Sequence, residues 1–264
     1  MPKNLKGQFL FLGTGASMGT PVVTCTCAVC QSDNPLNHRL RPSGLLKIEG
    51  KQILFDAGPD FRFQALKYGI NQLDGVVLTH GHYDHIAGLD DLRVYYFLQH
   101  QTLPCLLSRA TYDDLKRQSP YFFEGSGDDV MGGSRFQFKV VDEENCQTHF
   151  INMPWTIVSY IQNRMQVTGY RIGSFAYIMD LKEFSPSIFQ ALQGVEVLVL
   201  SGLRNRPSPA HLMLDEALAF SKKVGAKKTW FSHVSHELDH EETNRRLPDG
   251  AQLAYDGLEV SIEC

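Results

Sequence analysis

The sequence lacks three features that would each assign it to a particular class of protein. No stretch approaches the ~20 consecutive apolar residues of a membrane-spanning helix, so an integral membrane protein is not expected. No Lys/Arg-rich run occurs and the net charge is −4, so no global positive field would attract nucleic acid. The apolar run 9–12 ends at Gly13 and makes a poor signal peptide, so we expect a cytoplasmic protein.

Cysteine is also scarce, and three of the six cysteines fall within one short segment. In a reducing compartment these thiols are not expected to form structural disulfides. Cys25, Cys27 and Cys30 lie too close together for two crosslinks, and their spacing favours a metal site. Cys105 and Cys146 stand apart, and we predict that both are small buried side chains.

Repeats, low-complexity linkers and shifts of composition are absent, so one domain spanning residues 1–264 is expected. Strand-like and helix-like segments are interleaved, which predicts an α/β fold with sheets inside and helices outside. The Gly-rich stretch 124–134 predicts a flexible loop. The predicted strands cover residues 8–12, 45–48, 52–55, 75–78, 136–141, 155–160, 167–172, 176–179, 195–200, 228–231, 253–255 and 258–262. The predicted helices cover residues 59–68, 92–100, 110–119, 187–192 and 212–224.

The densest cluster of metal-ligating residue types is the run His80-Gly81-His82-Tyr83-Asp84-His85, directly after the strand predicted at 75–78. Imidazole and carboxylate are the usual protein ligands of zinc and similar divalent ions. On an extended loop His80 and His82 point the same way and would share one metal, while Asp84 and His85 would serve a neighbouring one. Two such ions can activate water and clamp the oxygens of a phosphodiester. A His-rich surface loop is the alternative, but the position after a buried strand favours a metal site.

This run resembles the His-x-His-x-Asp-His hallmark of the metallo-β-lactamase superfamily, and the resemblance extends along nearly the whole chain. The other similar segments are residues 11–15, 55–62, 88–93, 176–180 and 231–233. The resemblance implies an αββα sandwich with a dinuclear site at one edge. It also implies that Asp180 bridges the two metals and that His233 completes the second one.

The cysteine motif is similar to that of the branch containing the phosphoribosyl cyclic phosphodiesterase of phosphonate breakdown. A protein of pyrroloquinoline-quinone biosynthesis has a comparable motif, so the motif alone does not fix a substrate. The resemblance implies a structural zinc held by Cys25, Cys27 and Cys30, with His236 as the fourth ligand. That zinc would pin a small insertion, residues 21–44, to the active-site edge. Three reduced cysteines without a metal are the alternative.

The segment 206–212 resembles a family loop whose His lies beside the metals, and the matching residue is His211. It would donate a proton to the leaving alkoxide or bind a phosphate oxygen. The alternative is a polar residue at the start of a helix, since the helix predicted at 212–224 follows directly.

Two positions depart from the family pattern. Where a further His should complete the first metal, this sequence has Gln162, or Asn163 if the loop is one residue shorter. An amide oxygen is a weaker zinc ligand than imidazole. His149 lies too far upstream to align. The strand ending at Ser201 often ends in an acidic residue in relatives. These departures motivate the hypothesis of two metals held unequally.

We therefore predict a metal-dependent hydrolase, most specifically a phosphodiesterase for a small, possibly cyclic, phosphorylated substrate, with Asp84 and His211 as catalytic residues. The predicted cofactors are a structural Zn²⁺ and one or two Zn²⁺ or Mn²⁺ ions at the active site. The alternatives are a transfer-RNA 3′-processing nuclease and a degenerate binding protein that keeps only the fold and the structural zinc. Relatives are often dimers, so a homodimer stays open, although no pattern indicates an interface. Four arginines would be able to reach a substrate phosphate or to lie solvated at the surface: Arg39, Arg41, Arg204 and Arg206.

Overall fold

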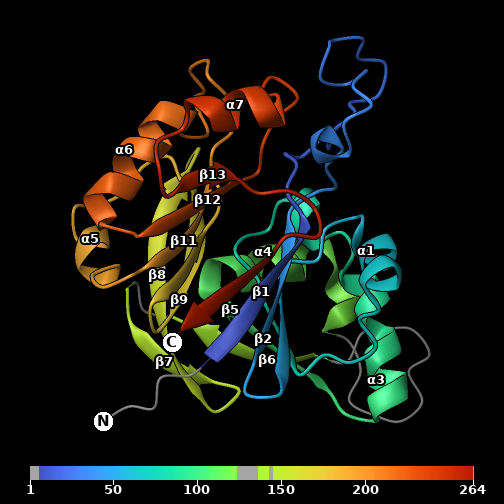
Figure 1. The fold of residues 1–264 in the computed structure, drawn as a ribbon. Helices are drawn as coiled ribbons and strands as arrows, with labels where there is room; N and C mark the ends of the chain where they lie inside the picture. The colour runs from blue at the N-terminus through green and yellow to red at the C-terminus, as the bar shows by residue number, and fades with distance from the viewer. Residues whose placement is uncertain (1–5, 124–135, 143–144, 264) are drawn as a thin grey trace.

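Two seven-stranded sheets form the centre of the molecule (Figure 1). The computed structural model describes residues 6–123, 136–142 and 145–263. The first sheet contains β1 (Lys6–Gly13), β2 (Ser43–Ile48), β3 (Lys51–Phe55), β4 (Gly75–Val77), β5 (Leu103–Ser108), β6 (Phe136–Val141) and β14 (Glu259–Glu263). The second sheet contains β7 (Gln147–Phe150), β8 (Met153–Gln162), β9 (Met165–Ile172), β10 (Phe175–Ile178), β11 (Val197–Ser201), β12 (Lys228–Ser232) and β13 (Ala251–Leu253). Their spatial orders are β14-β1-β2-β3-β4-β5-β6 and β13-β12-β11-β10-β9-β8-β7.

Helices cover the outer faces of both sheets (Figure 1). The α-helices are α1 (Phe61–Tyr68), α2 (Tyr83–Ile86), α3 (Arg93–Gln99), α4 (Arg109–Gln118), α5 (Ile188–Ala191), α6 (Leu214–Val224) and α7 (His240–Arg246). Short 3₁₀ helices occur at Pro35–Asn37, Leu89–Leu92 and Pro120–Phe122. Apolar side chains of α1, α3 and α4 pack on the first sheet, and those of α5 and α6 pack on the second. The predicted αββα sandwich is therefore confirmed.

Strand β1 shows why the sheets lie inside the helices. Its side chains alternate between two hydrophobic clusters: Phe9 and Phe11 pack between the sheets, whereas Leu10 and Leu12 pack under the outer helices. A strand buried on both faces reads as a continuous apolar run. Between the sheets, the Phe55 ring centroid lies 5.0–6.3 Å from those of Phe9, Trp155, Tyr170, Phe175 and Tyr177. Each fully buried aromatic side chain of this kind contributes about 1.5–3 kcal/mol.

The parallel strands direct their carboxyl ends, and the polar residues that follow, to a common edge. Strand β3 pairs in parallel with β4, and β10, β11 and β12 pair in parallel in the second sheet. Asp56 follows β3, and His80 follows β4 after two residues. In the second sheet, Asp180 follows β10 after one residue and His233 follows β12 directly. Sites in α/β proteins form at such carboxyl ends.

Several predicted elements differ from those observed. Strands β5 and β7 were not predicted, and the His-rich segment after β12 was expected to be a loop but contains α7. The strand expected at 253–255 is β13, two residues earlier, and the helix expected at 212–224 begins at Leu214. The loop predicted at 124–134 lies outside the described residues. Among the described helices, none combines the length and apolar character that a membrane crossing requires.

Candidate metal centre

Three buried residues at this edge leave their strands through a left-handed backbone conformation. Asp56, Asp180 and His233 have φ angles of 57°, 57° and 56°. Residues other than glycine rarely adopt this region, at a cost on the order of 1–3 kcal/mol, and such residues gather at functional sites. All three side chains are buried, so the surrounding fold holds them in this conformation.

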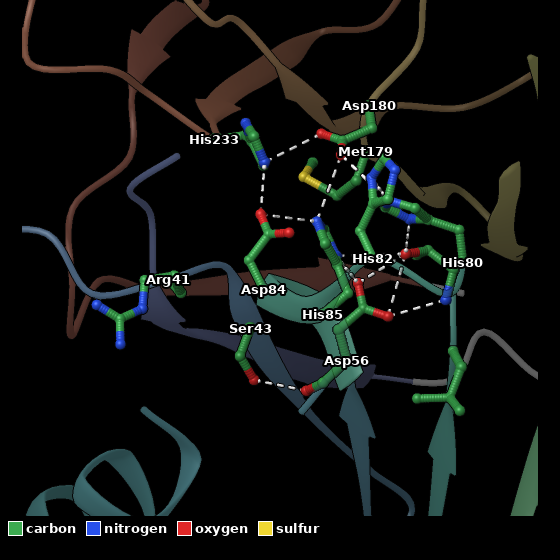
Figure 2. Close-up of polar contacts among 12 residues, drawn as sticks. Arg41, Ser43, Asp56, His80, His82, Asp84, His85, Met179, Asp180 and His233 are labelled. Carbon is green, nitrogen blue, oxygen red and sulfur yellow. Dashed lines mark hydrogen bonds and ion pairs between the residues drawn. The ribbon is translucent and has the colours of Figure 1, made fainter. Parts of the chain in front are cut away.

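Two groups of side chains meet at the edge and share Asp180 (Figure 2). In the first group, His80 Nε2 lies 2.8 Å from His82 Nδ1 and 3.3 Å from Asp180 Oδ2. In the second, His85 Nε2 lies 3.5 Å from Asp84 Oδ2 and 3.4 Å from Asp180 Oδ2. His233 Nε2 adjoins both carboxylates, 3.3 Å from Asp84 Oδ2 and 3.2 Å from Asp180 Oδ1. The fold thus brings together the six residues expected to hold two metals.

We expected the metal loop to be extended throughout, but part of it is helical. His82 precedes α2 in an extended conformation, but Asp84 and His85 lie within this single helical turn. The turn nevertheless leaves the rings of His80 and His85 side by side, with centroids 4.2 Å apart. Within this turn Asp84 and His85 are buried, whereas Tyr83 is exposed.

Asp56 and Thr79 orient two of the imidazoles, a role that the sequence did not reveal. His85 Nδ1 donates to Asp56 Oδ2 over 2.8 Å, and the Thr79 hydroxyl donates to the same carboxylate over 2.9 Å. Thr79 Oγ1 in turn accepts from His80 Nδ1 over 2.9 Å. In the neutral form that a metal ligand takes, both rings would therefore carry their proton on Nδ1 and turn the lone pair of Nε2 towards Asp180.

The electrostatics of the centre favour anionic carboxylates. Burial opposes ionisation of Asp180, but the facing rings of His233, His80 and His85 hold its pKa well below the usual range. Burial likewise opposes ionisation of Asp84, yet His85 and His233 lower its pKa. Burial would lower the pKa of His85, but Asp84 and Asp56 raise it well above the ordinary value. The two carboxylates are therefore anionic, and a bound cation would take over the charge compensation that the protonated imidazoles provide.

The arrangement fits divalent ions. His85 Nε2 and Asp180 Oδ1 are buried and have no hydrogen-bond partner among the described residues. His85 Nε2 faces two carboxylate oxygens, and a cation between them would take the place of the ring proton and be coordinated by all three atoms. Tetrahedral zinc with ordinary bond lengths separates a nitrogen ligand from an oxygen ligand by about 3.4 Å. The four imidazole–carboxylate separations around His85 and His233, 3.2–3.5 Å, match that value.

His211 lies beside this centre, and Gln162 contacts His211. His211 Nδ1 is 3.5 Å from Asp180 Oδ1, and its ring stacks on His233 with centroids 5.1 Å apart. Burial lowers the pKa of His211 to about 4, although Asp180 opposes the shift. The Gln162 amide nitrogen lies 3.2 Å from His211 Nε2. His211 lies outside α6, two residues before its N-cap Met213.

The four arginines considered for phosphate binding have different surroundings. Arg39 was expected at a substrate or at the surface, but it is 3% exposed and donates to Thr14 and to the Ala254 carbonyl. Arg204 and Arg206 lie near Glu237, and Arg206 donates to both of its carboxylate oxygens. Arg41 pairs with Asp60 over 2.8 Å.

Two other residues considered from the sequence make no hydrogen bond to the metal ligands within the described residues. His149 lies on β7, where it pairs with Pro154 at the edge of the second sheet far from β12. Ser201 is fully buried at the end of β11, and its hydroxyl has no hydrogen-bond partner within the described ranges.

A second cluster joins the N-terminal insertion to the loop after β12. The sulfur atoms of Cys25, Cys27 and Cys30 lie 3.2, 3.4 and 3.5 Å from His236 Nδ1. Tetrahedral zinc with three thiolates and one imidazole separates sulfur from nitrogen by about 3.5 Å. The residues fit a closed zinc site, as the motif predicted. Of the remaining cysteines, Cys105 is fully buried as expected, whereas Cys146 is only partly buried.

Comparison with known proteins identifies the family. Residues 51–234 match the model of the beta-lactamase superfamily domain. The chain is 32% identical over 257 residues to an octanoyltransferase of Porphyromonas gingivalis, covering 96% of this chain and 51% of that protein. The chain therefore spans about half the length of this curated relative.

Two solved structures extend the comparison. A new diphosphatase from the PhnP family is 38% identical, with a TM-score of 0.89 over 98% of each chain. Zn²⁺-bound PqqB from Methylobacterium extorquens is 18% identical, with a TM-score of 0.77 over 96% of this chain and 99% of that chain, and shows the fold alone. On the family match, the shared fold and the clustered His and Asp ligands, the chain belongs to the beta-lactamase superfamily.

Proposed function

We propose that this protein is a metal-dependent hydrolase that cleaves a P–O bond of a small molecule, either a phosphoric diester, cyclic ones included, or the anhydride of a diphosphate. The observation that carries the proposal is the pair of ligand groups joined by Asp180. Adjacent divalent ions suit the in-line displacement of an oxygen from phosphorus. The 38% identity to a diphosphatase along almost the entire chain supports displacement of an oxygen at phosphorus.

Each ligand group would have a defined role. His80, His82 and Asp180 would hold one ion, and Asp84, His85, His233 and Asp180 the other, as Zn²⁺ or Mn²⁺. When bound, the ions would activate water at neutral pH and neutralise phosphoryl oxygens. His211 would donate a hydrogen bond to a phosphoryl or leaving oxygen, since its Nδ1 faces Asp180 at 3.5 Å.

The proposal is tested by hydrolysis assays on the Mn²⁺- and Zn²⁺-loaded protein. The substrates are bis(4-nitrophenyl) phosphate, a dinucleoside diphosphate and an octanoyl thioester. We expect turnover of at least one of the two phosphate substrates, and a loss of about 100-fold or more in Asp84→Asn, because even outer-shell partners of ligands cost about 10–100-fold. The control is Asp142→Asn, an exposed residue paired with Arg109, which should retain wild-type turnover.

The same assays separate the alternatives. The name of the octanoyltransferase belongs to a chain twice as long, and thioester cleavage without phosphate cleavage would favour acyl chemistry. No turnover with any metal would favour a binding protein that keeps the fold. A transfer-RNA precursor is added as a fourth substrate, and turnover confined to it would favour the nuclease alternative.

A further inference from the structure

The outer surfaces of α1 and α3 form an apolar patch that the described residues leave open to solvent. Figure 1 shows the two helices next to each other on one side of the molecule. Half of the large apolar side chains that are exposed within the described ranges lie on these two short helices. They are Phe63, Leu66, Val94, Phe97 and Leu98, each 46–67% exposed. Side chains of both helices line a shared hollow of about 320 Å³. We call this surface the α1/α3 patch.

Both helices are apolar on two opposite faces. On α1, Phe61 is buried against the first sheet, whereas Phe63 and Leu66, three residues apart, form a stripe on the exposed side. On α3, Tyr95 is buried in the same cluster, and the three patch residues, spaced by three and four positions, are exposed. A surface helix normally has one apolar face, and a helix that is apolar all round is covered on both sides. The pattern therefore indicates a further layer over the patch.

The charged residues at the patch favour a second copy of the chain as that layer. Arg62 and Asp91 line the same hollow, and neither side chain forms an ion pair or hydrogen bond with another described residue. In a contact with two-fold symmetry, the pairing of residue i with residue j occurs twice. One unpaired charge of each sign is what such a self-complementary contact needs. An anionic lipid surface, in contrast, would attract Arg62 and repel Asp91.

The area of the patch is sufficient for the apolar core of a dimer interface. Large apolar side chains bury about 150–250 Å² each, so five of them at these exposures offer on the order of 500 Å². A standard interface buries about 800 Å² per partner, with an apolar core inside a polar rim. The five patch residues would supply the core, and the charged residues would supply part of the rim.

We propose that the α1/α3 patch is the interface through which two copies of this chain associate about a two-fold axis. Arg62 of each copy pairs with Asp91 of the other. The inference is independent of the proposed function, because no residue of the patch is among the metal ligands.

The test measures the mass of the full-length, metal-loaded protein in solution by light scattering and sedimentation. We expect twice the 29.7 kDa of one chain at about 10 µM, since interfaces of standard size have dissociation constants in the micromolar range or below. Leu66→Asp should raise the dissociation constant about 100-fold or more, because it buries an unpaired charge in each copy. Val23→Asp is the matched control: it alters another exposed apolar side chain, far along the chain in the insertion, and should change the constant by less than about 2-fold.

A charge exchange tests the two-fold arrangement. Arg62→Asp alone brings two carboxylates together across the interface, and Asp91→Arg alone brings two guanidinium groups together. Each should raise the dissociation constant about 10-fold or more through like-charge repulsion. The double variant Arg62→Asp/Asp91→Arg restores both pairs and should return the constant to within about 3-fold of the wild type. Circular dichroism verifies that every variant is folded.

A wild-type protein that is still monomeric at about 100 µM would overturn the proposal, since an interface of standard size would be saturated there. Cosedimentation of that monomer with phosphatidylcholine vesicles would assign the patch to a lipid surface instead. A dimer that Leu66→Asp leaves intact would also overturn it, because another surface would then hold the copies together. Failure of the charge exchange to restore association would contradict the pairing of Arg62 with Asp91.

Discussion

Asp56 shows how one carboxylate prepares a metal centre without being counted among its ligands. It accepts from the Thr79 backbone and hydroxyl and from His85 Nδ1. The Thr79 hydroxyl is in turn hydrogen-bonded to His80 Nδ1. One side chain thereby sets the orientation of an imidazole in each of the two groups. Partners of this kind affect metal affinity nearly as strongly as ligands do.

Asp56→Asn is therefore expected to weaken the binding of the active-site ions by about 10–100-fold. The asparagine NH₂ group would be a donor at a position where His85 Nδ1–H or the Thr79 hydroxyl needs an acceptor. Affinity is measured by competition with a chromophoric chelator. Asp74→Asn is the matched control, because Asp74 also accepts from a backbone N–H and a side chain, those of Gln52 and Lys51. Wild-type affinity in Asp56→Asn would contradict the role assigned to Asp56.

The predictability of individual residues follows from how local their signals are. The run 80–85 contains four ligands in six positions, so its chemistry was visible in the sequence. Asp180 and His233 came only from the family resemblance, because each stands alone after a strand. Asp56 has no local mark that separates it from an ordinary turn residue. The burial of Arg39 was not predicted, because its hydrogen-bond partners, Thr14 and Ala254, are both distant from it in sequence.

At the level of elements, the N-terminal insertion is held by polar contacts and not by an apolar core. Asn37 Nδ2 donates to Asp239 and Asn37 Oδ1 accepts from the His240 backbone at the start of α7. Figure 1 shows the insertion projecting beside α7. The cysteine cluster and His236 would add a covalent anchor at the same place, so zinc would be the principal restraint on the outer part of the insertion.

Cys27→Ser is expected to lower the zinc content by one ion per chain and to lower Tm by about 4–8 °C. A loss of about 2 kcal/mol produces this shift, since 1 kcal/mol corresponds to about 2–4 °C at this chain length. Elemental analysis and thermal unfolding measure the two effects. Cys105→Ala should lower Tm through its buried cavity but retain the zinc. Unchanged zinc content in Cys27→Ser would sink the assignment.

Elements with strong apolar patterns were predictable, and those formed by tertiary pairing were not. Strand β1 reads as five consecutive apolar or small buried positions and was predicted. Strand β7 alternates little and forms through its pairing with β8. Helix α7 has few apolar residues. Its start depends on Asp239, whose side chain accepts from the Glu242 backbone, and on contacts with the insertion.

At the scale of the whole molecule, one loop joins the two clusters of ligands. His233 and His236 are three residues apart, and Val234 between them exchanges backbone hydrogen bonds with Thr14 and Ala16. The loop thus connects the end of β12 to the start of the N-terminal insertion. The central claim is that these clusters hold different ions: a closed zinc in the cysteine cluster, and a pair at the sheet edge open to substrate.

Counting metals per chain tests this claim most directly. Elemental analysis is made on protein purified without chelator and again after mild chelation. We predict about three ions per chain, falling to one after chelation, because a closed thiolate site holds zinc more tightly than a site open to substrate. A single tightly held zinc, with no further uptake when Zn²⁺ or Mn²⁺ is supplied, would contradict the dinuclear centre and leave only the structural site.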